Sequence, residues 1–109
     1  MTSLLLTDDV RAALRSWAAE HRTPTTALVR ELLDRIAADP IRAFEVTIAC
    51  GDVPVRGGQI VPVAVADRAR WAAAKDALSA AFGGAVPTGR VVRGLLVDRL
   101  RADGVLPPR

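Results

Sequence analysis

Several residue types that carry chemistry or cross-links are nearly absent from this 109-residue chain. Cys50 is the only cysteine, so neither a disulfide nor a cysteine-based zinc site can form within one chain, as is typical of a reducing compartment. His21 is the only histidine, tyrosine is absent, and no motif pairs a nucleophile with a base. We therefore expect no enzyme activity, no metal centre and no cofactor.

Long hydrophobic runs are absent as well. No stretch approaches the length that crosses a bilayer, so we expect no membrane partner. The first residues contain three leucines without a basic segment ahead of them, and they reach Asp8 and Asp9 directly afterwards. This pattern is not that of a signal peptide, and we expect a cytoplasmic, nucleoid-associated protein.

The basic residues are almost all arginine, because Lys75 is the only lysine. The formal net charge is +3, and it is unevenly spread. Residues 1–50 carry six arginines against seven acids, whereas residues 51–109 carry nine basic residues against five acids. The excess is compatible with nucleic acid, although an ordinary arginine-rich surface explains it equally well.

A short repeat is the most informative feature of the chain. Residues 24–33 read PTTALVRELL and residues 87–96 read PTGRVVRGLL, with six of ten positions identical. Each copy has the apolar spacing of one helix face, which predicts two buried faces: Leu28, Val29, Leu32, Leu33 and Ile36, and Val91, Val92, Leu95, Leu96 and Leu100.

Each copy of the repeat follows another helix pattern and a strand-like run. The earlier helix buries Val10, Ala13, Leu14, Trp17 and Ala18, and its counterpart buries Trp71, Ala74, Leu78 and Phe82, before Gly83 and Gly84 close it. The strand-like runs are residues 3–6 and 60–65. This order predicts a first β-α-α unit over 1–40, a second over 60–104 and a tail over 105–109.

The segment between the units, residues 41–59, is predicted to be a linker with a strand. Residues 44–50 read FEVTIAC and alternate between apolar and mostly polar, which favours a half-buried strand. Gly51 and the pair Gly57 and Gly58 mark turns, so this strand can form a further hairpin with residues 60–65.

A strand, a helix starting Thr-Asp-Asp and a second helix opening TTALVRELL together resemble the ribbon-helix-helix superfamily, the fold of the Arc and MetJ repressors. The match covers residues 3–39, and more weakly 60–103. The resemblance implies a mainly helical fold with short strands, in which two units form a single-chain pseudo-dimer. It also implies sequence-specific binding of double-stranded DNA by an antiparallel strand ribbon in the major groove.

The resemblance assigns roles to two groups of residues. On each strand, alternate residues would face the DNA groove, namely Ser3, Leu5, Pro62 and Ala64. The residues between them would face the core, namely Leu4, Leu6, Val63 and Val65. The second-helix N-termini and the turn that follows would hold phosphates, through Thr25, Thr26, Arg30, Thr88, Gly89, Arg90 and Arg93.

The strand residues depart from the family pattern, because Leu5, Pro62 and Ala64 cannot hydrogen-bond to base edges. Three explanations stay open: base readout is weak, one unit is purely structural, or the reading strand has shifted to include Glu45, Thr47 or Gln59. The primary hypothesis is a transcriptional regulator or a plasmid partition or transfer factor that can self-associate on DNA. The alternative is a protein-interaction module, antitoxin-like or a scaffold partner, that reads no DNA.

Overall fold

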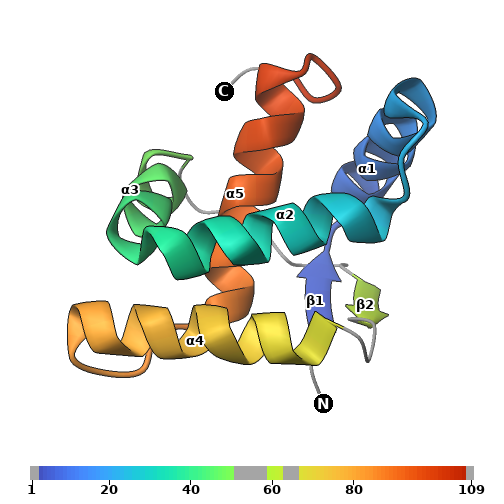
Figure 1. The fold of residues 1–109 in the computed structure, drawn as a ribbon. Helices are drawn as coiled ribbons and strands as arrows, with labels where there is room; N and C mark the ends of the chain where they lie inside the picture. Colours follow the sequence, from blue (N-terminus) through green and yellow to red (C-terminus); the bar gives the residue numbers. More distant parts are fainter. Residues whose placement is uncertain (1–2, 51–58, 63–66, 108–109) are drawn as a thin grey trace.

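The computed structural model describes residues 3–50, 59–62 and 67–107, which form five helices and two short strands (Figure 1). In chain order the elements are β1 (Ser3–Leu6), α1 (Asp8–His21), α2 (Thr25–Ala38), α3 (Pro40–Cys50), β2 (Gln59–Pro62), α4 (Arg68–Phe82) and α5 (Thr88–Ala102). Within this described part of the chain, every helix is too short or too polar to cross a membrane.

The strands pair antiparallel, as the resemblance implied for residues 3–6 and 60–65, although residues 63–65 lie outside the described part of the chain. Ser3 lies opposite Pro62, and Leu6 lies opposite Gln59. Successive residues of a strand point to opposite faces, and Leu4 and Leu6 accordingly share one face, which is buried. Pro62 has no N–H group for the ladder, and the end of the ribbon is where such a residue is tolerated.

The core is centred on α5, which crosses behind α2 and α4 in the view of Figure 1. The two copies of the sequence repeat supply most of its large side chains, as predicted. The buried residues of these helices include Leu28, Leu32, Leu33 and Ile36 from α2, and Val91, Val92, Leu95, Leu96 and Leu100 from α5.

Trp17 and Phe82, two aromatic residues expected in the core, differ in their outcome. Trp17 is buried, as predicted, with a 5 % exposed surface. The prediction that Phe82 packs inside is wrong, because 41 % of its surface is exposed at the end of α4. Phe82 is the last residue of α4, before Gly83 with its φ of 67°, and its ring is covered in part by Phe44 of α3, with 4.7 Å between the ring centroids.

The linker prediction is wrong for residues 44–50, which lie in α3 instead of a strand. The helix begins at Pro40, a favoured first helical residue. The Asp39 carboxylate accepts a hydrogen bond from the Arg42 N–H at 3.1 Å, which satisfies a backbone group of the first turn. Burial falls on Ala43, Thr47 and Cys50, which is helical spacing, and a run of seven residues is too short to distinguish the two periods.

The predicted fold class is wrong as well, because the chain does not consist of two equivalent β-α-α units. Two such units would cover each repeated helix in the same way. Instead α4 packs extensively along α2, whereas α1 touches α5 only slightly and α3 runs along α5 in its place. The described residues form a predominantly helical, five-helix fold with a single two-stranded ribbon. The third helix has no counterpart in the other half, so the twofold symmetry that a pseudo-dimer requires is absent.

Candidate nucleic-acid interface

The β1–β2 ribbon is the first element to which the family resemblance assigned DNA contact. Leu4 and Leu6 are 2 % and 0 % exposed, and β1 packs against α5, so the ribbon is fixed on the core by its inner face. The side chains of Ser3 and Leu5, and the whole of Ala64, lie outside the described residues. Their assigned contacts with DNA therefore remain predictions.

The N-terminus of α2 is the second predicted contact. Pro24 precedes the helix without a side-chain cap, and the first turn contains no acid. Thr26 is exposed there and Thr25 is half-buried. By contrast, α1 carries Asp8 and Asp9 in its first turn, which compensate the positive end of its dipole. The first turn of α2 has no such compensation, so it suits an external anion.

The N-terminus of α5 is not equivalent to that of α2, although the sequences echo each other. Thr88 is only 5 % exposed, and its hydroxyl has no hydrogen-bond partner within the described residues. Gly89 lies against Trp71, close enough that an added Cβ would stand 3.8 Å from the indole. Thr88 is therefore too enclosed for the phosphate contact that the sequence assigned to it, and Arg90 is the exposed residue of this turn.

Arg30 lies on the side of α2 that faces α4, where it forms an ion pair that the sequence did not reveal. Its Nε donates to the Asp67 carboxylate at 2.8 Å, and Asp67 is almost fully buried while the Arg30 side chain is 43 % exposed. The hydrogen bond and charge of Asp67 raise the pKa of Arg30 above its ordinary value. Arg30 therefore joins α2 to the start of α4, and only its outer surface remains for a ligand.

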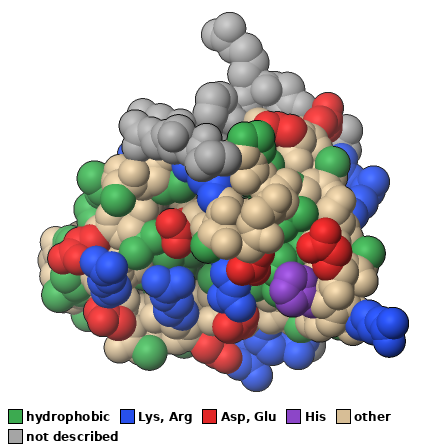
Figure 2. All heavy atoms as spheres, turned by 90° about the horizontal axis from the view of Figure 1, so that it is seen from above, with side chains coloured by type: hydrophobic (Ala, Val, Ile, Leu, Met, Phe, Trp, Pro, Cys, Tyr) green, Lys and Arg blue, Asp and Glu red, His purple; other side chains and the backbone are tan. Residues whose placement is uncertain are grey.

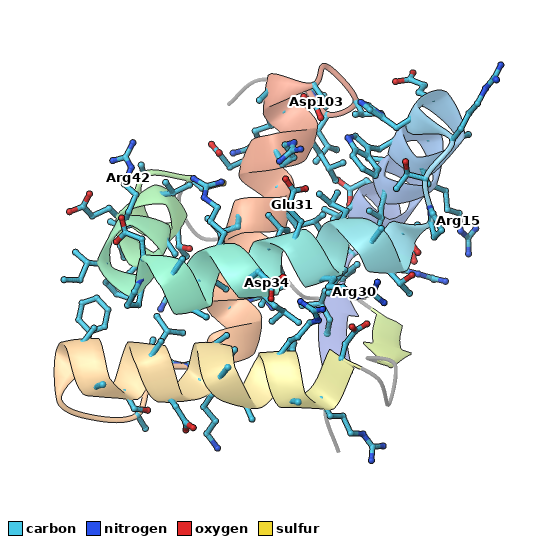
Figure 3. The ribbon with its side chains drawn as sticks, viewed as in Figure 1. Arg15, Arg30, Glu31, Asp34, Arg42 and Asp103 are labelled. Atoms are coloured by element: carbon cyan, nitrogen blue, oxygen red, sulfur yellow. The ribbon has the colours of Figure 1, made fainter. Side chains whose placement is uncertain are left out.

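The ion pair belongs to a small network between α2 and α4. Arg70 pairs with Asp34 at 2.5 Å, and its Nε lies 3.8 Å from the Asp67 carboxylate. Arg30 and Asp34 lie one turn apart on α2 (Figure 3). Asp67 is the residue that precedes α4. Its partner lies 37 residues away in sequence, so no local pattern can show the pair.

The residues proposed for a shifted reading strand do not share one surface. Thr47 is buried, with its hydroxyl 3.0 Å from the Ala43 carbonyl and 3.4 Å from the Val91 carbonyl. Glu45 is exposed on α3 and pairs with Arg42 at 3.3 Å. Gln59 is at the start of β2, in the ribbon itself. The correction is that Thr47 packs inside the protein and cannot reach DNA.

Trp17 holds the end of α1 against the end of α5, and His21 packs on Trp17 within α1. The indole N–H donates to the Asp103 carboxylate at 2.7 Å, and Arg99 lies 3.4 Å from the same carboxylate. The His21 ring stacks on Trp17 with a centroid distance of 4.3 Å, and its Nδ1 is 2.9 Å from the Trp17 carbonyl. The contact between Trp17 and Asp103 therefore joins one helix to the other.

Charges of both signs alternate over the face shown in Figure 2, so that this side presents no continuous basic surface among the described residues. In the same part of the chain, no group of three or more histidines, cysteines or acids could hold a metal ion. Three comparisons with known proteins were negative: no family model, no curated protein and no solved structure matches the chain. The expected membership of the ribbon-helix-helix superfamily is therefore without support from relatives, and the five-helix architecture contradicts it.

Proposed function

We propose that the chain binds double-stranded DNA, with the β1–β2 ribbon in the major groove and the N-terminus of α2 at a backbone phosphate. The observation that carries this proposal is the antiparallel ribbon anchored on α5 by Leu4 and Leu6. The major groove of B-form DNA admits a two-stranded ribbon of this kind.

The electrostatics support the same proposal. The chain carries a formal net charge of +3, with the excess in residues 51–109. Arg68, which is exposed, begins α4 shortly after β2 in the chain. The first turn of α2, with exposed Thr26 and no acid, adds a site for a phosphate oxygen. Phosphate contacts of this kind position a protein on DNA but carry no sequence information themselves.

A protein of this kind would act as a transcriptional regulator or as a plasmid partition or transfer factor, in the cytoplasm at the nucleoid. Base readout would be limited, since Arg30 is committed to Asp67 and the ribbon sequences contain mostly apolar residues. We therefore expect shape and phosphate contacts to contribute more to binding than direct hydrogen bonds to bases.

The test is fluorescence anisotropy of a labelled mixed-sequence duplex over a range of salt concentrations. We expect binding that weakens as salt rises, because each phosphate contact releases condensed counterions. Thr26→Asp should weaken binding by about tenfold, because a carboxylate at this helix end repels a phosphate. The same change favours the helix, so a loss of binding cannot be ascribed to unfolding.

The matched control is Ala37→Glu, which adds the same charge to an exposed position near the other end of α2. It should leave the affinity close to that of the unchanged protein. Ser3→Glu tests the ribbon directly and should weaken binding at least as much as Thr26→Asp. Absence of binding to any duplex at low salt, or equal effects of Thr26→Asp and Ala37→Glu, would contradict the proposal.

A further inference from the structure

The outer face of α3 carries a stripe of apolar side chains. Ile41 and Ile48 are 53 % and 55 % exposed, and half-buried Phe44 lies between them in sequence. Positions 41, 44 and 48 fall on one side of a helix, since residues three, four and seven apart are neighbours on its surface. The opposite side, with Ala43, Thr47 and Cys50, faces the core.

The stripe continues onto α4 through Phe82. The Phe82 ring lies 4.7 Å from the Phe44 ring, centroid to centroid, and 41 % of the residue is exposed. Ile41, Ile48 and Phe82 are the large hydrophobic residues that remain exposed in the described part of the chain. All three therefore belong to one surface, the α3 patch, defined as Ile41, Phe44, Ile48 and Phe82.

We infer that the α3 patch is a dimer interface, and that its occupant is the α3 patch of a second copy of this chain. The register of the helix supports self-pairing. When two α3 helices lie antiparallel about a twofold axis between Phe44 and Glu45, Ile41 of one copy is level with Ile48 of the other. The apolar residues at the two ends of the stripe then cover each other.

The charges beside the stripe are complementary under the same symmetry. Arg42 and Glu45 are exposed, pair within one chain at 3.3 Å, and lie along one edge of the stripe. Arg42 lies on the outer side of α3 in Figure 3. In the antiparallel pair, Arg42 of one copy is offset by only two residues, about 3 Å along the axis, from Glu45 of the other. Phe44 lies on the opposite edge, where it meets its own symmetry mate.

The size of the patch sets the strength of the dimer. α3 has eleven residues and is about 16 Å long, so two such helices bury less than the roughly 800 Å² per partner of a standard interface. We therefore expect a concentration-dependent dimer with fast exchange. This dimer does not require DNA, so the inference stands or falls independently of the proposed function.

Sedimentation equilibrium of the full chain tests the inference. The wild-type protein should dimerise below about 1 mM, where even an interface of modest size is populated. Replacing Ile41 and Ile48 together by serine should weaken the dimer at least tenfold while the helical circular dichroism is retained. A control with Ala12→Ser and Ala19→Ser, two exposed positions on α1, should dimerise like the wild type.

A mixing experiment identifies the antiparallel pairing itself. Arg42→Glu and Glu45→Arg each give the interface charges of one sign, so each variant alone should dimerise at least tenfold more weakly. Mixed in equal amounts, the two variants should associate again, because the two acidic side chains of one variant then meet the two basic side chains of the other across the interface. A wild-type chain that stays monomeric at about 1 mM, or a mixture that stays monomeric, would overturn the inference.

Discussion

Helices α2 and α5 open with similar ten-residue sequences, and another helix packs along each of them. The contacts that these two packed helices make have little in common. α4 packs along α2 with a buried carboxylate and ion pairs between the two helices. α3 packs along α5 through small residues in very close contact. The repeat therefore specifies the inner faces of both helices. The outer contacts depend on the neighbouring helix as well as on the positions at which the copies differ, because Arg30, which pairs with Asp67, is matched by an identical residue, Arg93.

One differing position accounts for much of the contrast. Glu31 in α2 corresponds to Gly94 in α5. A Cβ added at Gly94 would lie 2.7 Å from the Thr47 Cγ2 atom, which is closer than side chains approach. A glutamate at this place would keep α3 away from α5. Glu31 instead lies at the surface of α2, where it pairs with Arg99 at 3.4 Å.

The largest effect should follow from filling the space at Gly94. Gly94→Ala brings the new methyl group against Thr47 and should lower the free energy of unfolding by about 1–3 kcal/mol, because a packed interface resists added volume. Gly94→Glu, which makes α5 resemble α2, should lower it further by separating α3 from α5. Urea unfolding followed by circular dichroism measures both.

Two further variants separate crowding from a general effect of the substitution. Gly89→Ala in the same helix meets Trp71 at an ordinary 3.8 Å and should leave the protein as stable as before or slightly more stable. Combining Gly94→Ala with Thr47→Ala removes the two closest atoms and should recover part of the loss. Equal effects of Gly89→Ala and Gly94→Ala would refute the role assigned to close packing.

The sequence was sufficient for the features that depend on periodicity. Four of the five helices and the inner faces of α2 and α5 follow from local apolar spacing, and the structure confirms them. The strand pairing does not follow from local spacing, because the family resemblance implied it. The sequence does not identify α3, because seven alternating residues fit both periods. Asp39 and Pro40 begin this helix, but the same pair is equally typical of the end of the helix before it.

The contacts that break the symmetry could not be predicted, because each joins residues distant in the chain. Gly94 meets Thr47, and Arg30 meets Asp67, 37 residues away. The same limit applied to the candidate interface. Thr88 and Thr25 occupy matching positions in the repeat, yet Thr88 is buried and Thr25 is half-buried, because the helices around them differ.

The ion pairs on the α2 side should give an intermediate effect with a clear asymmetry. Asp67→Asn weakens a charged hydrogen bond and should lower the free energy of unfolding by about 1–2 kcal/mol. Arg30→Met should be more harmful, because it leaves the Asp67 carboxylate buried with only Arg70, 3.8 Å away, as a charged neighbour among the described residues. Thermal unfolding of both variants, measured at the same pH, tests this order.

The double variant Arg30→Met with Asp67→Asn gives the decisive comparison. It removes the charge that Arg30→Met leaves uncompensated, so it should be more stable than Arg30→Met alone. If the two single effects on the free energy of unfolding simply add, the ion pair does not couple α2 to α4. The electrostatic difference between the α2–α4 contact and the α3–α5 contact would then be refuted.

The smallest effect should come from Glu31, the residue that stands where α5 has Gly94. Its side chain is 55 % exposed and that of Arg99 is 33 % exposed, so water and salt screen the pair. Glu31→Ala should change the free energy of unfolding by no more than about 0.5 kcal/mol, and the difference should vanish in high salt. Urea unfolding at low and high salt measures it. The matching position in α5, Gly94, has no room for a side chain beside Thr47. A large and salt-independent effect of Glu31→Ala would therefore mean that α2 also uses this position for packing. The α2–α4 and α3–α5 contacts would then be more alike than the structure indicates.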